Sequence, residues 1–267
     1  MDYGEKLSRA RKQKGMTQQT LAEAVGVSTE AVSKWEKGLY RPDNTHREML
    51  CELLDLDYYD ENGELPDGRL FDEEHMSAFL KGKLNAGDFS QAQKALDFAK
   101  EQHQSHSRKG PGRVPYISHP LMMACHAFAM GVADDSLLCA VFLHDVPEDC
   151  GVLPESLPAG EEAREIVRLL TKKGAGFSER LYYEDIAANP KACLVKCLDR
   201  CNNLSTMAMG FSKTEIADYI EETERYFPRL LRVIKGCASY NDAAWLLQYQ
   251  MKSLLVTAKR ILQSSEA

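Results

Sequence analysis

Apolar residues recur every three or four positions along most of this 267-residue chain, which is the spacing of one face of an α-helix. From Asp88 onward, no segment alternates convincingly between apolar and polar residues as a half-buried β-strand does. The pattern predicts helices over residues 3–15, 16–26, 28–38, 45–56, 70–87, 89–104, 119–131, 134–146, 160–173, 191–209, 213–236 and 240–263. We therefore expect an all-α protein.

One polar segment divides this pattern into two parts. Residues 60–68, DENGELPDG, hold acidic residues, Gly and Pro with a single Leu, which is typical of an exposed turn. We expect a small helical head over residues 1–60, a linker and bridging helix over 61–87, and a larger helical bundle over 88–267. Two domains also suit the length of the chain, because domains commonly span ~100–200 residues.

Composition narrows the functions that the chain can have. With 44% hydrophobic residues it can bury a real core, and its net charge of −7 and pI near 5.6 exclude a basic surface over the whole protein. Any contact with nucleic acid must therefore be local. The N-terminus has no signal-peptide core, and no run of ~18 apolar residues occurs, so we expect a cytoplasmic protein without a membrane partner.

Eight cysteines are spread along the chain, and without an export signal we expect no disulfides. Cys193, Cys197 and Cys201 recur every four residues and share one helical face. No CxxC pair accompanies them. A packed helix face is therefore favoured over a zinc site.

Residues 17–38, TQQTLAEAVGVSTEAVSKWEKG, have the spacing of two short helices joined by a turn that contains glycine. Such a turn lets the second helix enter a major groove. Together with the later Pro42, this segment resembles the Cro-like phage-repressor family over roughly the first sixty residues. In that resemblance, Arg11 and Glu36 match an ion pair that ties the first helix to the third.

The same resemblance implies contacts with double-stranded DNA. It places Ser28 at a phosphate and four residues at base edges, namely Gln18, Thr29, Glu30 and Lys34. A carboxylate in the reading helix is costly near phosphates unless it accepts a hydrogen bond from cytosine. Cro-like heads often bind as pairs, so the resemblance also implies a homodimer. The alternative is a small helical bundle used for protein contacts or dimerisation.

A second group of residues has the chemistry of a metal site. His144 and Asp145 are adjacent at the end of an apolar segment, AVFLHD, but cannot complete a coordination shell alone. His119 stands just before Pro120, and Asp199 lies within an otherwise apolar helical segment, where a carboxylate is expensive unless it is paired or metal-bound. Two imidazoles and two carboxylates suit Mn²⁺, or Fe²⁺ or Zn²⁺, better than Ca²⁺.

These four residues match the ligand pattern of the HD superfamily of metal-dependent phosphohydrolases. Three segments, FAKEQHQSHSRKGPGRVPYISHP, LLCAVFLHDVPEDCG and LVKCLDRCNNLSTM, resemble the hydrolase domain of RelA/SpoT homologues, including the small alarmone hydrolases. The resemblance spans roughly residues 90–250. It implies removal of the 3′-pyrophosphate from (p)ppGpp, a guanosine tetra- or pentaphosphate, to give GDP or GTP and pyrophosphate.

The resemblance also implies roles for residues outside the ligand set. Glu148 and Asp149 match a Glu-Asp pair that acts on the attacking water. Arg108 and Lys109 match a pair that grips the nucleotide. The polar residues that match positions near the guanosine are Asn203 and Thr206.

Three functions remain open from the sequence. The first is a hydrolase with a DNA-binding head, and the second is a transcription regulator whose bundle senses (p)ppGpp without turnover. The third is a hydrolase of another nucleotide with a 3′-phosphate, such as NADPH. All four ligand positions and both acidic residues are present, which favours catalysis. Pro147, inside the acidic motif, departs from the family pattern and removes one backbone donor.

Overall fold

The computed structural model of the chain describes residues 3–54, 73–109, 114–172, 174 and 176–264. All regular elements within these residues are helices, which confirms the all-α prediction. The chain separates into two compact units, residues 1–70 and 71–267. Each unit has a hydrophobic core of its own.

The head contains four helices, α1 (Tyr3–Gln13), α2 (Gln18–Val25), α3 (Thr29–Glu36) and α4 (Asn44–Leu54). Thr17 caps α2 and Ser28 caps α3, because each side-chain oxygen accepts a hydrogen bond from a backbone N–H in the first turn. Gly26 ends α2 with φ of 77°, a left-handed conformation that glycine adopts without steric cost. The buried core comprises Leu7, Ala10, Leu21, Ala22, Val25, Val32, Trp35, Leu50 and Leu54.

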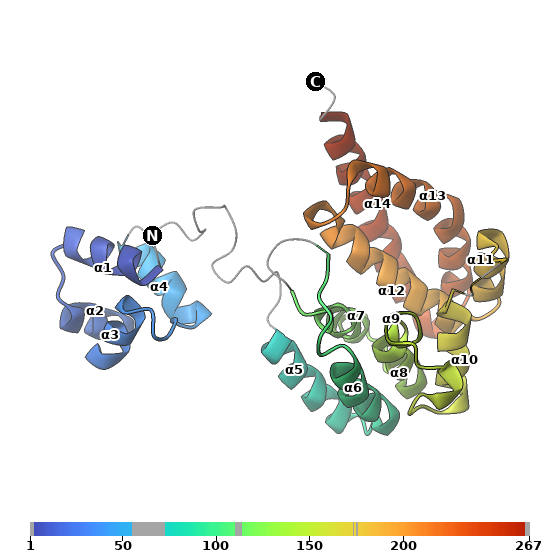
Figure 1. Cartoon of the computed structure of the whole chain (residues 1–267), viewed down its shortest axis with the longest axis horizontal. Coiled ribbons are helices and arrows are strands. Elements are labelled where there is room, and N and C mark those ends of the chain that lie inside the picture. The colour runs from blue at the N-terminus through green and yellow to red at the C-terminus, as the bar shows by residue number, and fades with distance from the viewer. Residues whose placement is uncertain (1–2, 55–72, 110–113, 173, 175, 265–267) are drawn as a thin grey trace. The chain divides into compact units, whose positions relative to one another are not determined.

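The larger unit is a bundle of ten α-helices within the described residues. They are α5 (Glu73–Ala86), α6 (Ser90–Gln102), α7 (Ser118–Ala129), α8 (Asp135–Leu143), α9 (Val146–Cys150), α10 (Glu161–Leu170), α11 (Glu179–Ala187), α12 (Pro190–Thr206), α13 (Lys213–Lys235) and α14 (Asn241–Ser264). Figure 1 shows α12 lying beside α13 and α14, with α7 and α8 beside α6 and α5. No helix in the described part of the chain is both long and apolar enough to cross a membrane.

The helix that the sequence suggested as a bridge belongs to the larger unit. Met76, Leu80 and Leu84 of α5 are buried in the same core as α6 and α7. The apolar spacing of these residues explains the packing, since they share one helical face. The segment 60–68, expected as a linker, lies outside the described residues.

Helices α8 and α12, which carry or adjoin several of the predicted metal ligands, are mostly buried. Every residue from Leu137 to Leu143 on α8 is buried, as are most residues of α12. Cys193, Cys197 and Cys201 are free thiols fully buried in this core, as a packed helix face requires. These two helices therefore form a rigid support for the polar residues that they carry.

Two helices were not predicted from the sequence. Helix α11 joins α10 to α12, and the short helix α9 follows α8 after a break. Pro147 explains the break, because in a continuous helix it could not donate to the backbone oxygen of Leu143 and its ring would clash with that carbonyl. In the first turn of α9 its missing N–H is not needed for an intrahelical bond. His144 and Asp145 occupy the junction, and Gly151 ends α9 in the left-handed conformation with φ of 69°.

Candidate active site

Four predicted metal ligands from three segments meet at one point. His119 lies in the first turn of α7, His144 and Asp145 at the junction of α8 with α9, and Asp199 in the middle of α12. His119 Nε2 is 3.3 Å from Asp199 Oδ1 and 3.6 Å from Asp145 Oδ2. His144 Nε2 is 2.9 Å from Asp145 Oδ2. Donor atoms distant in sequence thus surround one small volume.

The charges of this cluster depend on one another. Burial opposes ionisation of His144, but the neighbouring Asp145 carboxylate outweighs burial and raises the pKa of His144 to about 9. Burial would likewise raise the pKa of Asp199, but Lys196 and His119 hold it well below its usual range. The cluster therefore keeps both carboxylates ionised, which in a mostly buried site requires positive charge beside them.

Other side chains and one backbone group orient the ligands. His119 Nδ1 lies 2.6 Å from Asn202 Oδ1, and His144 Nδ1 lies 2.9 Å from the backbone oxygen of Val141. These acceptors place the proton on Nδ1 of each ring and leave Nε2 directed at the cluster. Tyr116 donates its hydroxyl hydrogen to Asp145 Oδ2.

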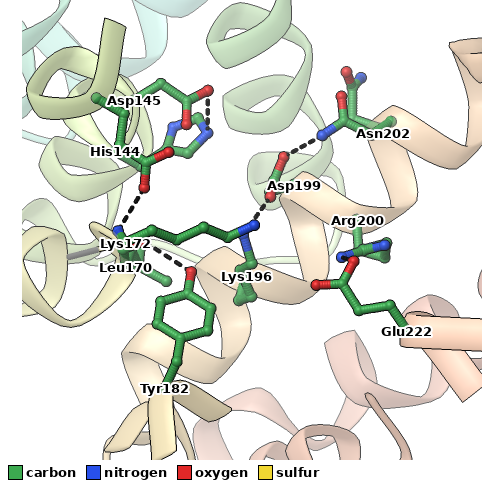
Figure 2. Close-up of polar contacts among 12 residues, drawn as sticks. His144, Asp145, Leu170, Lys172, Tyr182, Lys196, Asp199, Arg200, Asn202 and Glu222 are labelled. Atoms are coloured by element: carbon green, nitrogen blue, oxygen red, sulfur yellow. Dashed lines mark hydrogen bonds and ion pairs between the residues drawn. The ribbon is translucent and has the colours of Figure 1, made fainter. Parts of the chain in front are cut away.

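Helix α12 provides several of these groups from one face. Lys196 Nζ is 3.0 Å from Asp199 Oδ2, as Figure 2 shows, and Asn203 Nδ2 donates to Asp199 Oδ1 at 2.6 Å. Both partners lie within one turn of Asp199, at spacings that place them on the same face. The sequence analysis missed Lys196, Asn202 and Tyr116. A lysine one turn before a buried aspartate was the signal that could have identified the first of them.

A polar cavity of about 420 Å³ opens beside the cluster. Its walls come from the loop before α7, from α9, α10 and the segment after it, and from α12 and α13. They include three lysines, namely Lys109, Lys172 and Lys196. The cavity is wide enough for a small molecule and its lysines favour an anionic one.

Glu148 and Asp149 both line this cavity, on the first turns of α9. Glu148 Oε1 accepts a hydrogen bond from the backbone N–H of Lys172 at 2.6 Å. Burial raises the pKa of Asp149 above its ordinary value, and the nearby charge of Asp145 adds to the effect. A carboxylate with a raised pKa exchanges protons more readily near neutral pH.

The four residues expected to bind the nucleotide have different positions. Lys109 lines the cavity, and its Nζ is 2.9 Å from Glu215 Oε1. Arg108 reaches α12 instead, where its NH2 group donates to Asn203 Oδ1 and to Thr206 Oγ1, both at 2.9 Å. Asn203 lines the cavity as well. Arg108, Asn203 and Thr206 thus form a hydrogen-bonded group of which Asn203 lines the cavity.

In the head, one buried ion pair joins three helices. Arg11 of α1 donates to both carboxylate oxygens of Glu36, at 2.5 and 3.1 Å, and to the backbone oxygen of Met16. Gln18 of α2 also donates to Glu36, at 2.7 Å. The Arg11–Glu36 pair expected from the phage-repressor resemblance is therefore present.

The other residues expected to contact DNA lie at the start of α3 and along it. Thr29 and Glu30 are exposed, and Lys34 is half-exposed and forms an ion pair with Glu30 at 2.9 Å. Ser28 Oγ accepts the capping hydrogen bond from Ala31 N. Gln18 differs from the other four because its amide is held by Glu36 inside the head.

The two units match different known proteins. Residues 7–59 match the helix-turn-helix family model. The MESH1 protein of Xenopus tropicalis, a guanosine-3′,5′-bis(diphosphate) 3′-pyrophosphohydrolase, is 31% identical over 159 residues, which make up 55% of this chain and 85% of that protein. The chain belongs to the MESH1 family.

Further relatives agree with membership of the MESH1 family. Human MESH1 is 31% identical over 143 residues, which cover 49% of this chain and 80% of that protein. A longer Aquifex aeolicus pyrophosphohydrolase is 32% identical over 124 residues, only 17% of its own length. The solved structure of a metazoan orthologue of SpoT has a TM-score of 0.52 at 20% identity, covering 62% of this chain and 94% of that one. This likeness confirms the fold.

Membership of the MESH1 family and its HD-type fold imply a divalent metal, and the residues present fit one. His119, His144 and Asp199 form a group whose donor atoms lie within 4.8 Å of one another, and all three are buried. His144 Nε2 is buried and lies 2.9 Å from Asp145 Oδ2, at ion-pair distance but without a well-aligned hydrogen bond. A buried imidazole nitrogen that lacks a hydrogen-bond partner and lies among carboxylates is a suitable ligand atom for a divalent cation.

Proposed function

We propose that this protein hydrolyses the 3′-pyrophosphate group of a guanosine 3′,5′-bis(diphosphate)-type nucleotide, with a divalent cation, and that its head binds DNA. The observation that carries the proposal is one cavity. In it, the histidine and aspartate cluster, two further carboxylates and three lysines converge, in a chain of the MESH1 family. Hydrolysis would give GDP or GTP and pyrophosphate.

His119, His144, Asp145 and Asp199 would hold the cation. We favour Mn²⁺, with Fe²⁺ and Zn²⁺ as alternatives, because the donor set mixes two nitrogens with carboxylate oxygens. A bound cation of this kind polarises phosphoryl oxygens and makes water more acidic. Because His144 must be neutral to donate its lone pair, binding would displace the proton that Asp145 otherwise stabilises on it.

Glu148 and Asp149, which line the cavity, would handle protons there. Neither is among the four proposed ligands, so a carboxylate oxygen of either can accept a proton from the attacking water. The backbone N–H of Lys172 fixes one oxygen of Glu148. The raised pKa of Asp149 suits it to return a proton to the leaving oxygen.

The lysines supply the positive charge that a nucleotide with two diphosphate groups requires. Lys109 and Lys172 are exposed at the cavity wall, where they can reach phosphate oxygens. Lys196 is mostly buried, with 13% of its side chain exposed, and is paired with Asp199, so its role would be to hold that carboxylate in position. Arg108, Asn203 and Thr206, which are joined by hydrogen bonds, would bind the nucleotide together with Lys109.

For the head, the match of residues 7–59 to a helix-turn-helix family supports DNA binding. Thr29, Glu30 and Lys34 would face base edges from α3, and Ser28 would contact a phosphate. Gln18 would reach a base edge only after giving up its hydrogen bond to Glu36. A two-fold DNA site would require a homodimer, which we propose on the same resemblance.

The enzymatic proposal is tested by incubating the purified full-length protein with ppGpp and Mn²⁺, Fe²⁺ or Zn²⁺, and measuring GDP and pyrophosphate. Asp145→Ala should abolish turnover. Glu148→Gln should reduce kcat by about 10²–10⁴-fold, the usual contribution of a positioned acid or base, while Mn²⁺ binding persists. Glu155→Gln, an exposed glutamate of the loop after α9, is the matched control and should be fully active.

Two outcomes would redirect the proposal. Tight ppGpp binding without turnover under every cation would identify a sensor, and phosphate release from NADPH in preference to ppGpp would change the substrate. For the head, binding to the protein's own promoter DNA should weaken as salt rises. If no shift of that DNA occurs even at low salt, the head is a module for protein contacts.

A further inference from the structure

A second cluster of potential metal ligands lies outside the proposed active site. His103 directly follows α6, His106 comes three residues later, and Cys150 is the last residue of α9. His103 Nδ1 is 3.2 Å from His106 Nδ1, and Cys150 Sγ is 3.8 and 3.9 Å from these two nitrogens. Three donor atoms from two segments, with His103 and Cys150 47 residues apart, therefore form a compact triangle whose shortest side joins the two nitrogens.

The size of this triangle matches one face of a tetrahedral zinc site. With Zn–N bonds of about 2.05 Å and a Zn–S bond of about 2.3 Å, tetrahedral angles place two nitrogens about 3.3 Å apart and nitrogen and sulfur about 3.6 Å apart. The separations of 3.2, 3.8 and 3.9 Å differ from these values by at most about 0.3 Å. A cation could be bound with only small movements of the three side chains.

The protonation state of His103 also suits a metal. Burial lowers the pKa of His103 to about 4, so this imidazole is neutral and can donate a lone pair. Its ring stacks on Tyr116 with centroids 4.6 Å apart, which fixes its plane. The Cys150 thiol donates to the backbone oxygen of Gln102 at 3.6 Å, and metal binding would release that proton.

We propose that His103, His106 and Cys150 form a second metal site that takes Zn²⁺, with the fourth position open to water or an exogenous ligand. A thiolate with two imidazoles selects zinc over manganese or calcium, whereas the His and Asp cluster contains no sulfur. His106 and Cys150 are partly exposed, so a metal ion can enter from solvent.

The site would connect two parts of the cavity wall. His103 and His106 begin the segment that leads to Arg108 and Lys109, and Cys150 directly follows Glu148 and Asp149. An ion held between them would fasten this segment to α9. The inference does not depend on the proposed hydrolase activity, because it rests on a different set of ligands.

Cobalt(II) tests the site by spectroscopy. The metal-free full-length protein, reduced and kept under nitrogen, is titrated with Co²⁺ and then with Zn²⁺. We expect a sulfur-to-cobalt charge-transfer band in the near ultraviolet, saturating by two equivalents because the His and Asp cluster also takes Co²⁺, and its loss when Zn²⁺ displaces Co²⁺. Because the His and Asp cluster lacks sulfur, only a cysteine-containing site can produce this band.

Variants assign the band to a site. His119→Ala removes a ligand of the other cluster and should leave the band intact, as should Cys237→Ser, a partly buried cysteine elsewhere. Cys150→Ser should abolish it. If Cys150→Ser lacks the helical circular dichroism of the parent, His106→Gln decides, with an expected loss of at least ~10-fold in Co²⁺ affinity. A parent protein without the band, a band that survives Cys150→Ser, or unchanged affinity in His106→Gln overturns the proposal.

Discussion

The Glu222→Gln substitution measures how strongly one buried ion pair joins α12 to α13. Arg200 is only 2% exposed, and its NH2 group is 2.5 Å from Glu222 Oε2 (Figure 2). The guanidinium lies 3.8 Å from the centroid of the Tyr219 ring, which lines the cavity. Glutamine keeps the shape and can still accept from Arg200, but its amide nitrogen would face the Tyr183 hydroxyl, which donates to Glu222 Oε1 at 2.8 Å. The substitution therefore removes the negative charge and one hydrogen-bond acceptor.

The magnitude follows from the burial of the pair. Two unit charges 4 Å apart attract by about 4 kcal/mol at an effective dielectric constant of 20. Part of this energy is screened, since the side chain of Glu222 is 16% exposed. Leaving the cation buried without its partner should therefore cost about 3 kcal/mol. For a unit of this size, that cost lowers Tm by roughly 6–12 °C.

Thermal unfolding of the full chain, followed by circular dichroism, measures this loss. The matched control is Glu224→Gln on the same helix, whose exposed pair with Lys259 should contribute at most about 1 kcal/mol. Equal Tm values for the two variants at pH 7 would refute the assignment of a strong buried pair.

Acid provides a second check of the same pair. Burial would raise the pKa of Glu222, but Arg200 outweighs burial and holds the pKa below its ordinary value. The folded state therefore binds this proton more weakly than the unfolded chain does. The stability gap between parent and Glu222→Gln should be complete above about pH 5 and disappear as pH falls through the lowered pKa.

Three further substitutions test separate parts of the structure. Asn202→Ala removes the acceptor that orients His119, so Mn²⁺ affinity measured by calorimetry should fall about 10–100-fold. Lys172→Ala should raise KM for ppGpp with little change in kcat, because Lys172 offers uniform phosphate binding at the cavity wall. Gly4→Ala should destabilise the head by about 1–3 kcal/mol in thermal unfolding, although alanine usually favours a helix, because its Cβ would lie 2.6 Å from the backbone oxygen of Trp35.

The helical architecture could be predicted because periodicity was strong where helices are long. Residues 213–236 have an uninterrupted apolar face, and α13 forms there with a capping box at Ser212 and Glu215. The break between α8 and α9 could not be predicted, since apolar spacing continues across it. A proline in a first turn and a proline that ends a helix have the same local sequence, and tertiary packing decides between them.

The candidate site could be predicted where a residue type is unusual for its neighbours in the sequence. Burying a histidine beside an aspartate, or an aspartate inside an apolar helix, costs so much free energy that such residues indicate a partner or a metal. Tyr116 and Lys172 belong to the site through contacts with segments distant in sequence, namely with Asp145 and Glu148. The residues around them show no pattern from which these contacts could be predicted. The partners of Arg108 also depended on three-dimensional packing, because Asn203 and Thr206 are 95 and 98 residues away.

The concentration of polar groups on α12 has a consequence for how this protein can evolve. One face of this helix carries Asp199, its partner Lys196, and the amides of Asn202 and Asn203. The other faces pack into the core. A sequence change that shifts the register of this helix would disturb all of these groups at once. Divergence toward new substrates is therefore easier through Lys109 and Lys172, which line the cavity but do not belong to α12, so that each side chain can be exchanged alone.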